Sequence, residues 1–361
     1  MKTAFLTHPL FLEHDTGSGH PERPQRLTAI WNHLRAVGLW DELLHLPFEA
    51  ASVADLERCH TPAHIARVQA IAQSGGGALD GDTIISPKSF EAAALASGAA
   101  MRAVDATMSG EVDNAFVAAR PCGHHAESGR RASSPWGFCL FNPVAVAARH
   151  AQAKWGLERV AILDFDVHHG NGTQEIFYDD RSVFFASIHE SPLFPGSGAP
   201  SERGVGEGLG TTLNLPMGRR NPNVITRRLP DGALWRQRWR RLRKPLERFA
   251  PQLILLSAGY DAHSDDPLAH IELRTEAFAE LTGDAKNWAQ SLCDGKLVAV
   301  LEGGYNLKAL SQSVAATLEV LKADSPFPEP DDFHKEAEEA LRQLPPSWTP
   351  PRSDKTDPQA T

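Results

Sequence analysis

Cysteine is scarce in this chain. Its 361 residues include four cysteines, namely Cys59, Cys122, Cys139 and Cys293. None of them stands in a C-x-x-C motif, which argues against a disulfide framework and favours free thiols in a reducing compartment. The apolar run over residues 1–7 is too short for the core of a signal peptide and ends at His8-Pro9. We therefore expect a cytoplasmic protein.

The sequence also lacks a long apolar run and a dense basic stretch. No apolar run approaches the length that spans a bilayer, so we expect no membrane partner. The formal net charge is −9, and Trp235, Trp239 and Leu242 interrupt the basic face of the helix expected around the most basic segment, residues 236–244. That pattern is typical of a solvated helix face, so we expect no nucleic-acid partner. A composition of 42% hydrophobic and 22% charged residues indicates a globular protein with a large core.

Strands and helices are predicted to alternate along most of the chain. Apolar runs of strand length lie at residues 4–7, 115–119, 160–163, 183–188, 252–257 and 297–301. Such alternation predicts an α/β fold, in which helices wrap a parallel sheet and a site forms at its carboxyl edge. After Lys322 an acidic helix at residues 331–344 and a Pro-rich, disordered end are expected. We therefore predict a catalytic domain over 1–322 and a tail over 323–361.

The most informative stretch follows the predicted strand at residues 160–163. Asp166 and His168 are two residues apart, so on an extended chain their side chains point the same way. Alone, such a pair serves equally well as a buried structural contact. Asp261 follows another predicted strand, and the three side chains together offer zinc ligands with a fourth position open for water or substrate. That arrangement is typical of a catalytic zinc site.

Other polar residues supply the groups that amide hydrolysis requires. His124 and His125 follow a third predicted strand and are candidates for the general base and the general acid. Asp164 and Asn171 are candidates to orient the two imidazoles. Tyr305, after two glycines, is a candidate donor to the developing oxyanion. The pattern predicts metal-assisted amide hydrolysis without a covalent intermediate.

Five motifs together resemble the histone deacetylase superfamily. They are RPCGHHA (120–126), GFCLFN (137–142), DFDVHHGNGTQ (164–174), SAGYDAHSDDPL (257–268) and LEGGYNL (301–307). The resemblance runs in order from about residue 14 to residue 307. It implies a single arginase/deacetylase-type α/β domain with a central parallel sheet of eight strands flanked by helices. It also implies a zinc ion on Asp166, His168 and Asp261.

The same resemblance assigns further roles. Phe138 and Phe194 would flank a channel for the acyl-lysine stem, with Gly137 near its mouth. Arg26 would line an inner pocket through which acetate leaves, although alone it is interpreted as a solvated residue at a helix start. A structural potassium ion would be surrounded by Asp164, Asp166, His168, Ser187 and Ile188.

Three positions depart from the family pattern. Asn171 stands where class I enzymes carry Asp, which favours the class II-like branch of bacterial amidohydrolases. Cys122 replaces a more usual proline, either as an oxidation-sensitive thiol or as inert packing. Pro143 replaces an asparagine, and a proline is comfortable in the first turn of a helix.

The substrate has two candidate classes. Leu268 follows Asp266-Pro267, where the polyamine-specialised relative carries Glu, and this favours an acylated lysine peptide or protein. An acetylpolyamine amidohydrolase is the alternative, in which a carboxylate at the channel rim would bind the cationic substrate. Candidates for that carboxylate are Asp15, Glu22 and Asp82.

Two other functions are less consistent with the residues. A binuclear manganese hydrolase of the arginase type needs further bridging ligands, and Asn171 is a poor bridging group. A non-enzymatic acyl-lysine binder would not need the complete set of ligands, bases and Tyr305. The long irregular stretch at residues 191–210 is compatible with a homo-oligomer, because relatives with long rim loops often associate, but the composition does not require one.

Overall fold

A computed structural model describes residues 1–131, 134–218 and 231–328. Its main sheet has the strand order β1-β4-β9-β8-β5-β6-β7, and all neighbouring strands are parallel. The strands are β1 (Thr3–Leu6), β4 (Asn114–Val117), β5 (Val160–Asp164), β6 (Val183–Ser191), β7 (Thr212–Gly218), β8 (Leu253–Ala258) and β9 (Leu297–Leu301). The predicted α/β fold with a central parallel sheet is confirmed.

The expected count of eight strands is wrong for the described residues, whose main sheet has seven. The two other strands, β2 (Gly77–Ala78) and β3 (Ile84–Ile85), pair only with each other. They form a short antiparallel hairpin in which each strand offers only two residues for pairing. This hairpin lies before helix α4 in the chain and does not extend the sheet.

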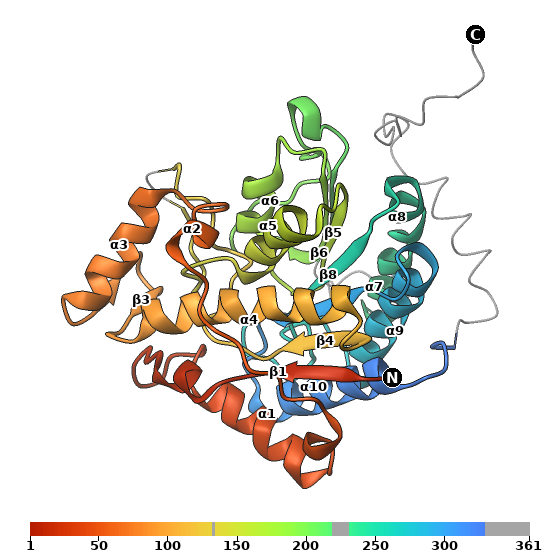
Figure 1. Ribbon diagram of the computed structural model, residues 1–361, viewed down its shortest axis with the longest axis horizontal. Coiled ribbons are helices and arrows are strands. Elements are labelled where there is room, and N and C mark those ends of the chain that lie inside the picture. Colours follow the sequence, from red (N-terminus) through yellow and green to blue (C-terminus); the bar gives the residue numbers. More distant parts are fainter. Residues whose placement is uncertain (132–133, 219–230, 329–361) are drawn as a thin grey trace, which may run out of the picture.

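Ten α-helices are described, and most of them pack on the two faces of the sheet. They are α1 (Gln25–Ala36), α2 (Val53–Leu56), α3 (Pro62–Gln73), α4 (Ser89–Ser109), α5 (Pro143–Trp155), α6 (Asn171–Phe177), α7 (Asp231–Arg240), α8 (Arg243–Phe249), α9 (Thr275–Leu292) and α10 (Leu307–Lys322). Helices α4 and α5 pack together on one side, and α1, α9 and α10 pack together on the other (Figure 1). No helix of the described ranges is long and apolar enough to cross a membrane.

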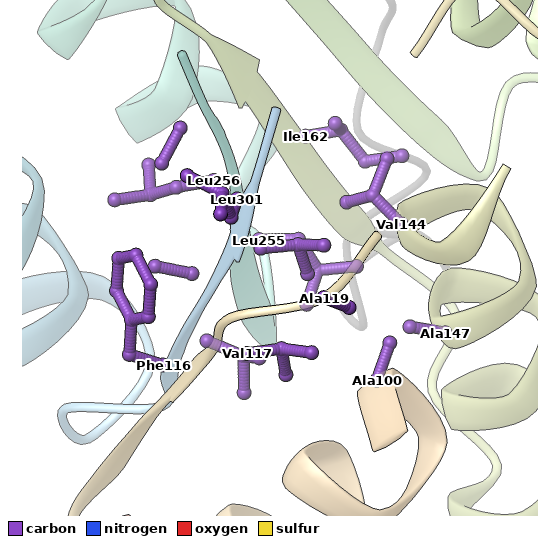
Figure 2. Packing of buried hydrophobic residues seen from close by; sticks show 14 of the residues in the cluster. Ala100, Phe116, Val117, Ala119, Val144, Ala147, Ile162, Leu255, Leu256 and Leu301 are labelled. Atoms are coloured by element: carbon purple, nitrogen blue, oxygen red, sulfur yellow. The ribbon is translucent and has the colours of Figure 1, made fainter. Parts of the chain in front are cut away.

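The core follows from the strand sequences. The residues of β4, β5, β8 and β9 are all buried, as expected for apolar strands covered by helices on both faces. Side chains alternate between the faces: Phe116 points to one side of the sheet, and its neighbour Val117 points to the other, where Ala100 and Ala147 lie (Figure 2). Small alanines on α4 and α5 let these helices approach the sheet closely.

The start of α5 shapes the site. Asn142 caps the helix by accepting a hydrogen bond from the Ala145 N–H at 3.0 Å, and Pro143 occupies the first turn, as predicted. A Cβ on Gly123 would lie 2.1 Å from the Cδ of Pro143, so only glycine allows this approach. The two histidines that follow Gly123 are thereby held against α5.

Some predicted segments lie partly or wholly outside the described residues. The basic segment 236–244, expected to form a helix face, lies on the end of α7 and the start of α8, and residues 219–230 before α7 are not among those described. The predicted helix at 331–344 and the Pro-rich end also lie outside the described ranges. The predicted irregular stretch 191–210 begins one residue later than expected, because β6 extends through Ser191, and it contains a 3-10 helix over Gly206–Gly208.

Candidate active site

The candidate site lies at the carboxyl ends of four neighbouring strands. The histidine pair follows β4, Tyr305 follows β9, Asp261 follows β8, and Asp166 with His168 follows β5. The sheet order β4-β9-β8-β5 makes these strands consecutive neighbours. The motifs are far apart in the chain, and the parallel sheet brings them to one edge, where ligands bind in folds of this class.

The three predicted metal ligands form one cluster. Nitrogen Nδ1 of His168 lies 3.1 Å from Oδ1 of Asp166 and 3.1 Å from Oδ2 of Asp261. The second oxygen of each carboxylate is already bound: Asp166 accepts the Gly303 N–H at 2.8 Å, and Asp261 accepts the Val167 N–H at 2.9 Å. One ligand atom from each residue remains within 4.8 Å of the others.

The surroundings of this cluster fit a divalent cation. A Cβ on Gly303 would lie 2.1 Å from Oδ2 of Asp261, and one on Gly259 would lie 2.0 Å from Oδ2 of Asp166. Burial lowers the pKa of His168, but hydrogen bonds to the two carboxylates outweigh it and raise this pKa to about 10. Two buried carboxylates that favour a cation this strongly, beside a nitrogen donor, match the ligand types of zinc.

The two adjacent histidines have different partners. His124 Nδ1 lies 2.9 Å from Oδ2 of Asp164, whereas His125 Nδ1 lies 2.7 Å from Oδ1 of Asn171. Burial lowers the pKa of both rings, but Asp166 and Asp164 outweigh it at His124 and raise that pKa well above its usual value. At His125 burial and the neighbouring His124 and His168 leave the pKa well below its usual value. The surroundings therefore favour the charged form of His124 and the neutral form of His125.

Aromatic rings surround the approach to the histidines. The Phe194 ring centre lies 5.0 Å from that of His125, and the Phe138 ring centre lies 6.0 Å from that of Tyr305. Gly137 adopts φ +47°, and a Cβ there would lie 2.3 Å from the His125 ring. Phe194 is 41% exposed, which places it at a rim. The residues expected from the resemblance to line a channel are thus brought together around His125 and Tyr305.

The interpretation of Arg26 as a solvated helix-start residue is wrong. Arg26 is fully buried, and its guanidinium donates to the Gly304 carbonyl at 2.7 Å and lies 5.1 Å from the centre of the Tyr305 ring. Glu22 neutralises it at 3.1 Å, and Arg120 also donates to Glu22 at 2.7 Å. A guanidinium can be buried here because a carboxylate pairs with it.

The same network shows that one candidate for the rim carboxylate, Glu22, is wrong. Glu22 is fully buried between two arginines and cannot face a substrate at the rim. Asp15 and Asp82 are exposed. Asp82 lies beside the channel aromatics, since its carbonyl is 2.9 Å from the His20 ring nitrogen, and that ring packs 4.7 Å from the Phe138 ring. Leu268 is half-buried on the loop after Asp261.

Two buried carboxylates had not been singled out for a role. Asp266 accepts the backbone N–H of Tyr305, and Glu302 accepts the backbone N–H groups of Gly123 and His124 at 2.7 Å and 3.0 Å. Glu302 lies between an apolar strand and two glycines, and Asp266 precedes a proline inside the motif 257–268. A carboxylate in such a context was the available signal, because burying one requires hydrogen-bond donors around it.

The residues expected around potassium are adjacent in the structure. Asp164 pairs with Ser187 across β5 and β6, and Ile188 follows Ser187 in β6. These residues are fully buried, as is Asp166, and His168 is nearly so. Oxygen donors of this type suit a hard cation.

The cysteines are all buried and free. The sulfur of Cys122 lies 3.3 Å from that of Cys139, beneath the loop that carries Gly137. Burial, followed by the contact with Cys122, raises the pKa of the Cys139 thiol well above its usual value. A buried and protonated neighbour supports inert packing of Cys122 over reactivity.

The fold and the site define an enzyme that hydrolyses amide bonds. Residues 20–321 match the histone deacetylase domain, and the chain belongs to the histone deacetylase family. It is 39% identical over 311 residues to a probable deacetylase of Archaeoglobus fulgidus, covering 85% of this chain and 82% of the relative. It is 38% identical over 307 residues to a histone deacetylase-like amidohydrolase of Pseudomonas aeruginosa, covering 83% and 77%.

Two further similarities bear on structure and substrate. The crystal structure of the HDA15 HD domain matches with a TM-score of 0.81 and 32% identity, covering 96% of this chain and 95% of that one. Human polyamine deacetylase HDAC10 is 40% identical over 319 residues, which cover 84% of this chain but 45% of that protein. The expected family and the α/β fold are confirmed, and the substrate that the human relative's name gives is a polyamine.

Proposed function

We propose that this protein is a zinc-dependent amidohydrolase that removes acetyl or short acyl groups from the side-chain amine of lysine. The observation that carries the proposal is the convergence of Asp166, His168 and Asp261 beside His125, whose Nδ1 contacts Oδ1 of Asn171. Family membership supports a deacetylase, since the matched domain covers most of the chain. When bound, zinc would supply Lewis acidity that polarises the amide carbonyl and acidifies water.

The two imidazoles divide the proton transfers between them. Because Oδ1 of Asn171 only accepts, His125 donates through Nδ1 and keeps the lone pair of Nε2 for the proton of the attacking water. The Asp164 carboxylate favours a charged His124, which then stabilises the negative charge of the site and holds a proton for the leaving amine. This assignment uses each histidine in the protonation state that its partner favours.

Tyr305 completes the site as a neutral donor. Burial raises the pKa of its phenol well above the usual value, so the hydroxyl keeps its proton. From its position next to the Phe138 ring it would donate to the developing oxyanion. We further propose that a potassium ion bound near Asp164 and Ser187 stabilises the loop that carries the zinc ligands.

A polyamine substrate is the second candidate, and one observation favours it. The exposed Asp82 lies on the Phe138 side of the channel, where a carboxylate would attract a distant ammonium group. The Leu268 side chain and the Phe138 and Phe194 rings favour an apolar methylene chain next to the acylated nitrogen. The lysine side chain offers such a chain, and a polyamine offers part of one. We rank lysine first because Leu268 stands where the polyamine-specialised relative has Glu.

The test compares turnover by the zinc-loaded enzyme. An acetyl-lysine peptide should be hydrolysed with higher kcat/KM than N-acetylputrescine, and the reverse preference would replace the substrate assignment. Tyr305→Phe and His125→Ala should each lower kcat by about two to four powers of ten. Tyr178→Phe makes the same chemical change at the end of α6 and should leave kcat unchanged. Near-normal activity of Tyr305→Phe would refute the proposed role of the phenol.

A further inference from the structure

A buried carboxylate outside the assigned site is bonded to the backbone of Tyr305. Asp266 is 7% exposed and stands five residues after the metal ligand Asp261. Its Oδ2 accepts the Tyr305 N–H at 2.6 Å and the Asn306 N–H at 3.3 Å, and its Oδ1 accepts the Leu268 N–H at 3.0 Å. Three backbone donors therefore hold one side chain, and two of them belong to the segment that carries the phenol.

Burying the charged Asp266 carboxylate at this position costs free energy. Burial, followed by the charge of Asp261, raises the pKa of Asp266 to about 7. An amide or an apolar residue would avoid that cost if the position only needed to be filled. The hydrogen bonds to the backbone explain why a carboxylate stands here, because only a carboxylate accepts at both oxygens.

The Tyr305 segment has little rigidity of its own. Gly303 and Gly304 precede the tyrosine, and Gly304 adopts φ +118°, where residues with side chains are rare. The Gly303 N–H is bound by the metal ligand Asp166, and Arg26 holds the Gly304 carbonyl. The next N–H, that of Tyr305, is held by Asp266.

The far side of Tyr305 is anchored from the same loop. Asn306 caps helix α10 by accepting the Ala309 N–H at 3.0 Å, and its amide donates to the carbonyl of Asp265 at 3.1 Å. The loop after β8 is therefore hydrogen-bonded to the start of α10 through the Asp265 carbonyl and the Asp266 side chain. It also carries Asp261, so one segment connects the metal-ligand cluster to the phenol.

We infer that Asp266 is a positioning residue for Tyr305, which fixes the main chain of the tyrosine and thereby the place of its hydroxyl relative to the metal-ligand cluster. The inference rests on the proposed role of Tyr305 in amide hydrolysis. A displaced phenol would bind the ground-state substrate almost unchanged but would stabilise the transition state poorly. Loss of the carboxylate should therefore act on kcat and not on KM.

The experiment is a double-mutant cycle on the zinc-loaded enzyme with an acetyl-lysine peptide. Asp266→Asn keeps the shape of the side chain but turns an amide donor toward a backbone N–H. We expect kcat to fall by about 10- to 100-fold, KM to change by less than about threefold and zinc content to stay unchanged. In the Tyr305→Phe background the same substitution should lower kcat by less than about threefold, because the hydroxyl it positions is absent.

Two further variants sharpen the test. Asp265→Asn makes the same change at the exposed neighbouring carboxylate and should leave kcat within about twofold of wild type. Asp266→Glu keeps two acceptor oxygens and should retain more activity than Asp266→Asn. Should Asp266→Asn fail to fold, Asp266→Glu is carried through the same cycle with the same criterion, a loss of kcat that vanishes in the Tyr305→Phe background.

The outcomes separate this inference from the proposed function. An equal loss of kcat in both backgrounds, or no loss in the wild-type background, would overturn the positioning role of Asp266. Near-normal activity of Tyr305→Phe by itself would instead refute the proposed role of the phenol. A loss of zinc from Asp266→Asn would also overturn the inference, since the carboxylate would then act through Asp261.

Discussion

A buried histidine beside the site makes the stability of this protein depend on pH. His60 is 1% exposed; its Nδ1 donates to the carbonyl of Glu127 at 3.0 Å, and its Nε2 accepts the Asn142 N–H at 2.9 Å. Only the neutral ring can make both bonds, because a protonated Nε2 can no longer accept the Asn142 N–H. Burial, followed by the charge of the nearby His64, lowers the pKa of His60 from 6.5 to about 3. Protonation would remove an acceptor at the start of α5.

The neutral His60 ring stabilises the folded chain less as the pH falls. The unfolded chain binds a proton at His60 below pH 6.5, whereas the folded chain resists it down to about pH 3, so this contribution to stability is present above pH 6.5 and is lost as the pH falls. At about pH 5.5, one unit below the unfolded pKa, the loss from His60 alone is about 1.4 kcal/mol.

Urea unfolding at about pH 7.5 and about pH 5.5 tests this value. His60→Gln keeps a donor and an acceptor but cannot be protonated, so its deficit in unfolding free energy relative to wild type should shrink by about 1.4 kcal/mol at the lower pH. Val68→Ala, in the buried face of α3, removes no titratable group and should show the same deficit at both values. A His60→Gln deficit that does not change with pH would refute the reasoning.

Three other predictions concern charge, thiols and metal. Glu22→Gln should lower the unfolding free energy by about 3–5 kcal/mol, because Arg26 and Arg120 lose a buried partner. Glu91→Gln, at the exposed pair with Lys88, should lower it by less than about 1 kcal/mol. Similar losses for the two variants in urea unfolding would contradict this prediction. Ellman's reagent should label no cysteine rapidly in the native enzyme and all four after denaturation, and rapid native labelling would show a reactive thiol. A chelator should abolish turnover and zinc restore it at about one ion per chain, whereas two manganese ions would support the arginase-type alternative.

The parts of the fold that depend on local sequence could be predicted. Strands such as β5 and β8 are uninterrupted apolar runs, and a strand buried on both faces requires such a run. The metal-ligand cluster was also predictable, because Asp166, His168 and Asp261 are charged or polar residues directly after these runs. Their ligand atoms lie within 4.8 Å of one another, and their role as metal ligands stays a prediction.

What depends on distant pairing could not be predicted from the residues alone. Arg26 was interpreted as solvated because nothing in its neighbourhood shows that Arg120, 94 positions along the chain, shares its partner Glu22. The order of the strands is a similar case, because any order of parallel strands buries the same apolar runs. The hairpin β2–β3 was missed because two-residue strands carry no periodicity.

The strand order also explains how the site keeps its shape. Each junction between neighbouring loops of β4, β9, β8 and β5 is closed by a carboxylate that accepts a backbone N–H from the adjacent loop: Glu302 from Gly123, Asp266 from Tyr305 and Asp261 from Val167. These carboxylates fix the distances between neighbouring loops and also bring negative charge to the site. Because such bonds preorganise the groups that act only in the transition state, removing the acceptor of Glu302 or of Asp266 should reduce the rate of hydrolysis more than substrate binding.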